Sequence, residues 1–168
     1  MAEIDRLRNT RIFNTPLESG LRALILLCAA DKQYYDLQNL VYFDYLLTHS
    51  GDIEKGPKSL HADIPHRLSA IAMRRQLSFS GLDLMVSRDL VEKKFDPVKG
   101  VTYAATDLAI KFLSYFSTAY YKDLLIRANW VITEFGNSSA DDLKKIFNSN
   151  FDRWNSEFTK EDFQRFNK

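Results

Sequence analysis

Apolar residues recur at helical spacing along most of the chain, and local signals mark where each helical stretch begins. Thr15, Pro16 and Glu18 form the pattern of a capping box with proline at the first helical position. Such a start satisfies the free N–H groups of the first turn. The apolar run from Leu21 to Ala30 then predicts a largely buried helix.

A second helix is predicted over residues 37–50. Asp36 is its expected N-cap, and Gly51 its expected end. The segment that follows, Gly51–Pro65, carries two glycines and two prolines within 15 residues. Because such residues resist both helix and strand, we expect a loop there.

A third helical stretch is predicted from His66 to Leu90, because its apolar positions keep helical spacing throughout. Gly81 interrupts the pattern, and glycine costs about 1 kcal/mol against alanine inside a helix. The sequence therefore leaves open one long helix or two helices broken near this glycine. Arg74 and Arg75 belong to a polar run that we expect to face solvent.

After this stretch the spacing of the apolar residues changes from that of a helix to that of the two strands of a β-hairpin. Two strand-like runs, at residues 91–95 and 101–105, flank a five-residue turn that contains Pro97 and Gly100. Thr106 is the predicted N-cap of a helix that ends near Ser117. A helix over residues 119–135 and a short one after residue 138 or 139 are expected to follow.

Three helices, a hairpin and a helix succeed one another in the order of a winged helix-turn-helix. We therefore predict a mainly α fold, with a winged helix-turn-helix-like core, one short β-hairpin and additional C-terminal helices. Residues 1–149 are assigned to this domain and residues 150–168 to an aromatic-rich, helical C-terminal tail. A fold of this kind does not by itself indicate a function.

Composition narrows the class of protein further. The 168 residues are 45% hydrophobic, which is enough to build a core, and the formal net charge of +1 argues against a strong nucleic-acid binder. One cysteine cannot form an internal disulfide. The charged N-terminus does not resemble a signal peptide, and the longest apolar run is too short to span a bilayer. We expect a cytoplasmic protein without a membrane segment.

All three histidines fall in one polar cluster between Asp44 and Arg67. One interpretation makes His49, His61 and His66 metal ligands in an enzyme. The other has them hold the Gly/Pro-rich loop to the second helix. The second is favoured, because the spacing matches no standard zinc pattern and no cysteine assists. The sequence also lacks phosphate-binding and nucleophile motifs, so no catalytic residue, metal or cofactor is predicted.

Basic residues of the third stretch and the hairpin are candidate DNA contacts. Between residues 66 and 99, seven lysines and arginines stand against four acids, which leaves a local charge of +3. The acids are interleaved with the bases, as on an ordinary solvated face. Contacts to DNA are therefore expected to be weak or to form only within a larger assembly. The candidates are Arg74, Arg75, Arg88, Lys93 and Lys94.

Aromatic residues of the tail are candidates for binding a partner protein. Phe151, Trp154 and Phe158 are spaced three and four apart and so share one helical face. Thr159 and Asp162 indicate the start of a further helix, with Phe163 and Phe166 on its face. Such a stripe either packs on the core of its own domain or docks another chain, where aromatic side chains carry much of the binding energy. The sequence leaves both interpretations open.

Residues 14–147 resemble the small middle component of bacterial three-component ABC-ATPase systems. The resemblance rests on four blocks, at residues 14–22, 36–52, 59–67 and 85–91, of which the second is long and unusual. The polar residues that mark the family are Asp44, Tyr45, His49, Ser50, His61, Pro65 and Arg67.

The resemblance implies a non-enzymatic adaptor. Such a subunit would bind an SMC-like ABC ATPase and help assemble or restrain an effector, expected to be a nuclease, in defence against phage or plasmid DNA. Systems of the Lamassu type look like a related arrangement. The alternative from the fold alone is a stand-alone winged-helix DNA-binding regulator, against which the interleaved acids count.

Overall fold

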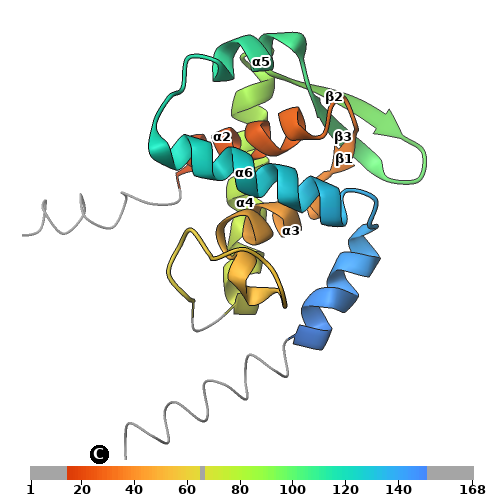
Figure 1. Ribbon diagram of the computed structural model, residues 1–168. Coiled ribbons are helices and arrows are strands. Elements are labelled where there is room, and N and C mark those ends of the chain that lie inside the picture. The colour runs from red at the N-terminus through yellow and green to blue at the C-terminus, as the bar shows by residue number, and fades with distance from the viewer. Residues whose placement is uncertain (1–14, 65–66, 151–168) are drawn as a thin grey trace, which may run out of the picture.

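The computed structural model describes residues 15–64 and 67–150 (Figure 1). It is mainly helical with a small antiparallel sheet, so the predicted fold class is confirmed. Residues 140–150 form a further helix after the labelled elements. The labelled elements are α2 (Pro16–Ala29), β1 (Tyr35–Asp36), α3 (Leu37–Thr48), the 3-10 turn η1 (Ser50–Asp52), α4 (Arg67–Val86), β2 (Val91–Asp96), β3 (Gly100–Ala105), α5 (Asp107–Leu113) and α6 (Ala119–Phe135).

The helix starts follow the capping chemistry of the sequence. The Thr15 hydroxyl accepts a hydrogen bond from the Glu18 backbone N–H, and the Glu18 carboxylate accepts one from the Thr15 N–H at 3.0 Å. Asp36 caps α3 by accepting from the Asn39 N–H at 2.8 Å. The predicted starts of both helices are therefore confirmed.

Three strands form the sheet, in the order β1-β3-β2. The hairpin of β2 and β3 is confirmed, and its last pair, Asp96 with Gly100, closes the expected turn. The strand β1 was not expected from the sequence, because two residues are too few to show a period. The order of helices and strands is the one that a winged helix-turn-helix requires, and the winged-helix assignment stays a prediction.

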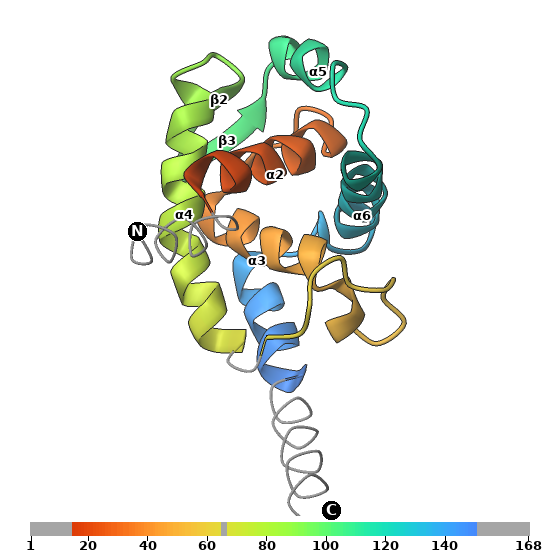
Figure 2. The same ribbon diagram turned by 90° about the vertical axis from the view of Figure 1, so that its left-hand side faces the viewer.

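Helix α2 forms the centre of the core. Figure 2 shows it between α4 and α6, with α3 beneath it. Its Leu24, Leu26 and Leu27 are fully buried, as are the large side chains of α3 that face it. A central helix with neighbours on several sides needs apolar side chains around most of its circumference, which explains the long apolar run.

Helix α4 continues without a break through Gly81, which settles the open choice between one helix and two. Gly81 lies where α4 crosses α2, opposite Gly20. A Cβ at Gly81 would lie only 2.5 Å from the Gly20 nitrogen and 2.6 Å from the Pro16 carbonyl oxygen. The glycine therefore allows close contact between two backbones and does not interrupt the helix.

The helix at residues 140–150 packs against α3. Ser139 caps it by accepting from the Asp142 N–H at 3.1 Å, as one of the two expected caps. Its Phe147 is buried against Tyr42 and Tyr45, with ring centroids 4.8 and 5.4 Å apart. None of the described helices combines the length and apolar composition needed to cross a membrane. The aromatic residues predicted for the tail, from Phe151 onward, lie outside the described residues.

Candidate functional site

A carboxylate on α3 lies buried between two guanidinium groups from the neighbouring helices. Asp44 accepts from Arg22 Nε at 2.5 Å and from Arg22 Nη2 at 3.2 Å, in a bidentate pair. On its other side, Arg74 Nη1 donates to the same carboxylate at 2.6 Å and to the Asp44 carbonyl oxygen at 3.1 Å. All three residues are less than a tenth exposed. The ionic network thus ties α2, α3 and α4 together.

The two arginines keep Asp44 ionised. Burial by itself would raise the pKa of the carboxyl group, but the charges and hydrogen bonds of Arg22 and Arg74 outweigh it and lower the pKa to about 2. Because the pKa in the folded protein lies below the ordinary value of 3.8, the network stabilises the fold above that pH. This contribution is lost as the pH falls towards 2.

Arg74 does not face solvent, and the expectation from the sequence is wrong on this point. Its side chain lies on the same face of α4 as Ile71 and Ser78, which are also buried. The spacing of three and four residues puts Arg74 in the apolar stripe, where its charge is matched by Asp44. Arg74, a candidate DNA contact from the sequence, is therefore buried within its own domain and not presented to DNA.

His49, at the C-terminal end of α3, is enclosed by the same network. Its Nε2 lies 3.1 Å from the Ala62 carbonyl oxygen, and a carbonyl can only accept, so Nε2 carries the proton. Nδ1 is then an acceptor, 3.4 Å from Arg74 Nη2 and 2.9 Å from the Thr48 hydroxyl. Burial and the Arg74 charge lower the pKa of His49 to about 4, so the ring is neutral at physiological pH.

Acid is expected to destabilise the fold through His49. The folded protein binds a proton at this ring only near pH 4, whereas an ordinary histidine does so near 6.5. The unfolded chain therefore binds more protons between these values, and stability falls as the pH falls. From about pH 7 to pH 5 the loss should be about 2 kcal/mol. Urea unfolding of the chain and of His49→Gln at both pH values measures it, and an equal loss in the variant would contradict it.

The remaining motif residues attach the Gly/Pro-rich loop to α3. The Thr48 carbonyl oxygen accepts from the N–H groups of Leu60 and His61 at 3.0 and 3.1 Å. The Ser50 hydroxyl donates to the Lys58 carbonyl oxygen at 3.3 Å, and the Tyr45 hydroxyl donates to Asp52. These bonds supply partners for loop backbone that has no regular ladder.

The structure brings together only part of the histidine cluster. His49 and His61 are in ring contact, with centroids 5.9 Å apart, while His66 and Pro65 lie outside the described residues. Of Arg67 only the backbone is described, at the start of α4. In residues 15–64 and 67–150, no group of three or more His, Cys, Asp or Glu side chains is arranged to hold a metal ion.

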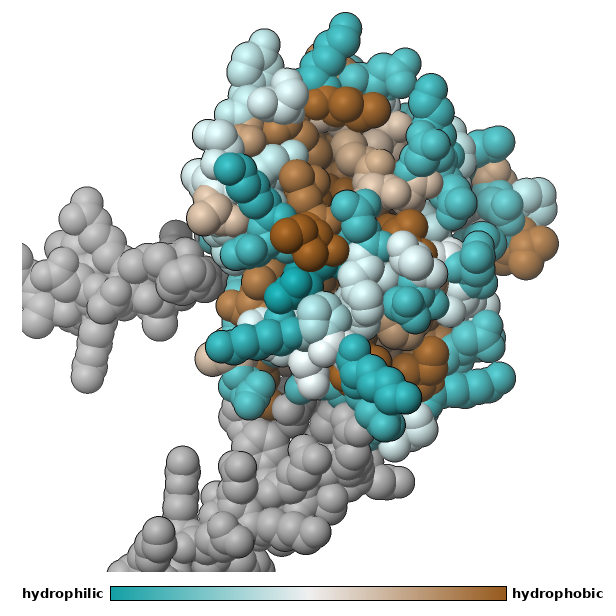
Figure 3. Space-filling model, viewed as in Figure 1, coloured by the Kyte–Doolittle hydropathy of each residue, from teal (hydrophilic) through white to brown (hydrophobic). Residues whose placement is uncertain are grey.

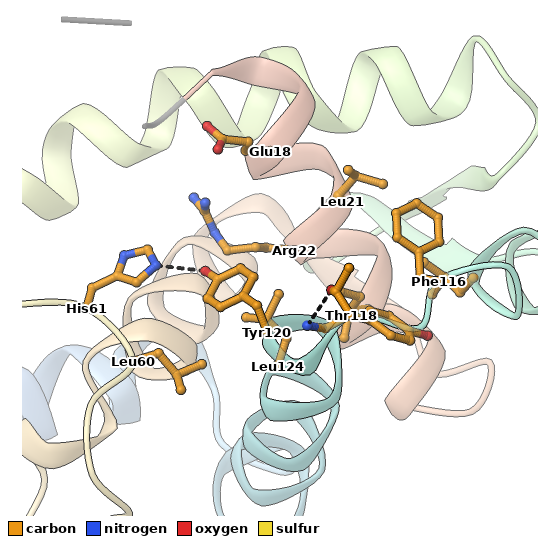
Figure 4. A pocket seen from close by; sticks show the side chains of 12 residues that line it. Glu18, Leu21, Arg22, Leu60, His61, Phe116, Thr118, Tyr120 and Leu124 are labelled. Atoms are coloured by element: carbon orange, nitrogen blue, oxygen red, sulfur yellow. Dashed lines mark hydrogen bonds between the residues drawn. The ribbon is translucent and has the colours of Figure 1, made fainter. Parts of the chain in front are cut away.

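The polar network borders an apolar pocket of about 490 Å³ between α2, the loop and α6. His61 and Tyr120 close one end through a hydrogen bond of 2.7 Å between Nε2 and the hydroxyl, and Glu18 and Arg22 lie beside it (Figure 4). Figure 3 shows hydrophobic side chains gathered between α5 and α6. The apolar lining consists mainly of Leu21, Ile25, Leu60, Leu113, Phe116 and Leu124.

The other candidate DNA contacts lie at the surface and are partly engaged. Arg75 donates to the Gln38 side chain at 2.7 Å, and Lys93 forms an ion pair with Asp83 at 2.9 Å. The ammonium of Lys94 lies 5.3 Å from the centre of the Tyr34 ring. Arg88 is exposed in the turn after α4. These residues do not join the ionic network or the pocket.

Sequence reasoning did not single out Arg22 or Tyr120, which complete the network and the pocket. Arg22 had a recognisable signal, because it is the only charged residue in the apolar run from Leu21 to Ala30. A charge in such a run needs a buried partner. Tyr120 had no such signal, since its role depends on the loop, 59 residues earlier in the chain, reaching α6.

Comparison with known proteins gives one family. A family model described as ABC-three component (ABC-3C) system Middle Component 2 matches residues 12–157. The match includes the whole ionic network and all the residues that line the pocket. Neither the curated proteins nor the solved structures gave a match.

Proposed function

Because the chain belongs to the Middle Component 2 family of ABC-three component systems, we propose that it is the non-catalytic adaptor of such a system. In this role it binds an SMC-like ABC ATPase and helps hold an effector nuclease, in cytoplasmic defence against phage or plasmid DNA. The family match over residues 12–157 is the observation that carries the proposal. The relation to Lamassu-type systems stays a prediction.

The engagement of the motif side chains supports an adaptor. The motif residues Asp44 and His49 both hydrogen-bond to Arg74, and His49 also bonds to a loop carbonyl, which is what a structural anchor requires. The burial of Cys28 raises the pKa of its thiol to about 11, so little thiolate is available as a nucleophile at physiological pH. The open feature beside the network is an apolar pocket, which is suited to binding.

The adaptor proposal predicts a stable complex with the ATPase and the effector encoded beside this chain. All three proteins are to be co-expressed with an affinity tag on the ATPase only, and the mass of the purified assembly gives its stoichiometry. We expect this chain to co-purify in a fixed ratio through size-exclusion chromatography. The proposal would be overturned if the chain is a free monomer or homodimer that binds neither the ATPase nor the effector.

DNA binding by the isolated chain is expected to be weak. Of the surface bases, Lys93 is paired with Asp83 and Arg75 is bonded to Gln38, which lowers the charge they present to phosphates. Fluorescence anisotropy with a random duplex should therefore give dissociation constants above about 10 μM at physiological salt. Tight, salt-sensitive binding that is lost in the Arg75→Glu, Arg88→Glu double variant would favour the DNA-binding regulator instead.

A further inference from the structure

The polar end of the pocket contains a buried guanidinium, one donor group of which is not engaged by any described residue. Arg22 is 5% exposed, and its Nε and Nη2 both donate to Asp44. In the part of the chain that the structure describes, its Nη1 makes no hydrogen bond. In Figure 4 the guanidinium extends to a place between Glu18 and His61, at the edge of the pocket. A buried donor of this kind calls for an acceptor.

An anionic acceptor suits this donor best, because the donor belongs to a charged guanidinium. Asp44 supplies one negative charge to the two guanidiniums of Arg22 and Arg74. The pKa of His61 is lowered first by burial and then by these two arginines, whereas Asp44 and Glu18 raise it. Glu18 is the acid on the rim, where its carboxylate accepts from the Thr15 N–H and hydroxyl, and its negative charge offsets the second positive one. A carboxylate that reaches Arg22 Nη1 would form a charge-assisted hydrogen bond, which is stronger than a bond to a neutral acceptor.

The rest of the pocket is suited to large apolar side chains. Ile25, Leu113 and Leu124 are buried and form part of its wall, while Leu60 and Phe116 are half-buried. Its volume of about 490 Å³ falls within the range of sites that enclose most of a bound ligand. An apolar group that fills such a site gains burial without disturbing the fold.

We propose that this pocket docks a segment of a protein partner in the ABC-3C assembly, in which a carboxylate stands next to large apolar side chains. The carboxylate accepts from Arg22 Nη1, and the apolar side chains contact Leu60, Phe116 and Leu124. The inference rests on the proposed adaptor function. It identifies this pocket as one surface through which the adaptor contacts a partner. A charged guanidinium donor next to an apolar wall selects an acidic, amphipathic segment over a purely apolar one.

Site-specific photo-cross-linking in the assembled complex tests which molecule occupies the pocket. Phe116 is replaced by p-benzoylphenylalanine, and the neighbouring Tyr115, which is 87% exposed and does not line the pocket, receives the same replacement as the matched control. We expect position 116, and not 115, to cross-link to a partner segment in which Asp or Glu adjoins Leu, Ile, Phe or Trp. The cross-linked peptide is identified by mass spectrometry.

Other cross-links from position 116 would overturn the inference. These are a cross-link to residues 1–14 or 151–168 of the same chain, to a second copy of the chain, or to a partner segment without an acid. An intact complex with no cross-link above the Tyr115 control would overturn it as well. In each of these cases the complex still forms, so the adaptor function would survive. If the complex fails to assemble, both the adaptor function and the docking inference are overturned.

A pair of substitutions at Leu60 tests whether the partner group bound next to Arg22 is negatively charged. Leu60→Glu places a carboxylate at the pocket that competes for Arg22 and repels the partner's acid, whereas Leu60→Lys adds a side chain of similar length and opposite charge. We expect the first to weaken the complex by about tenfold or more and the second by less than about threefold. Equal weakening, or a larger effect of lysine, would contradict a bound carboxylate. Thermal unfolding of both variants confirms that they fold.

Discussion

Replacing Asp44 with alanine is expected to lower the free energy of unfolding by about 3 to 5 kcal/mol. The reason is the burial of Arg22 and Arg74, whose guanidiniums would face each other without the carboxylate between them. Urea unfolding of the full chain, followed by circular dichroism, measures the loss. We expect Asp44→Asn to lose nearly as much, because it retains the shape of the side chain and removes only its charge.

The matched control for Asp44 is an exposed ion pair on the same fold. Asp83 pairs with Lys93 at 2.9 Å, but its side chain is 62% exposed, so Asp83→Ala is expected to cost no more than about 1 kcal/mol. If Asp44→Ala lost no more than Asp83→Ala, the network would not hold the three helices together.

Replacing Gly81 with alanine is expected to destabilise the fold by at least about 3 kcal/mol, near the upper end for an overpacked core. In an open helix the same change would stabilise by about 1 kcal/mol. Here the new methyl group would lie 2.5 Å from the Gly20 nitrogen and 2.6 Å from the Pro16 carbonyl oxygen. Both atoms belong to backbone, so α2 and α4 must separate along their crossing.

Ser80→Ala is the control for Gly81, because it adds no volume at the neighbouring position of α4. We expect its unfolding free energy to stay within about 0.5 kcal/mol of the parent chain. Thermal and urea unfolding of both variants measure the change in the free energy of unfolding. A neutral or stabilising Gly81→Ala would show that the two helices do not meet as closely as described.

Helix α2 connects these predictions to function. It contributes Arg22 to the ionic network, Gly20 to the helix crossing and Leu21 to the pocket. Loss of a partner complex in a variant of Asp44 or Gly81 would therefore follow from displacement of the pocket wall. Only substitutions on the rim, such as those at Leu60, separate docking from folding.

Part of the site could be predicted from the sequence. The polar block around Asp44, His49 and His61 was recognised because all three histidines of the chain fall within it and because it resembles the family. The roles within the block could not be predicted. Whether His49 donates to a loop carbonyl or binds a metal depends on where Ala62 lies, and no local pattern gives that position.

Local interactions explain why so many elements were predicted correctly. The capping box at Thr15, the N-cap at Asp36 and the turn around Gly100 each act within a few residues of the chain. The bounds of α2 and α6, the loop after α3 and the hairpin therefore agree with the sequence. Such signals are present in the unfolded chain as well, so they do not need a tertiary partner.

Tertiary structure alone decided the features that join distant segments. The strand β1 exists because β3 pairs with Tyr35 and Asp36, more than 60 residues earlier in the chain. Arg74 is buried because α4 places it against Asp44, and Gly81 is tolerated because Gly20 lies opposite it. The sequence by itself determined the hairpin, the family and the helices other than α4, whose continuity through Gly81 it left open. The network and the pocket arise only when α2, α3, α4 and α6 pack, because their energies depend on burial and on partners that a linear pattern does not contain.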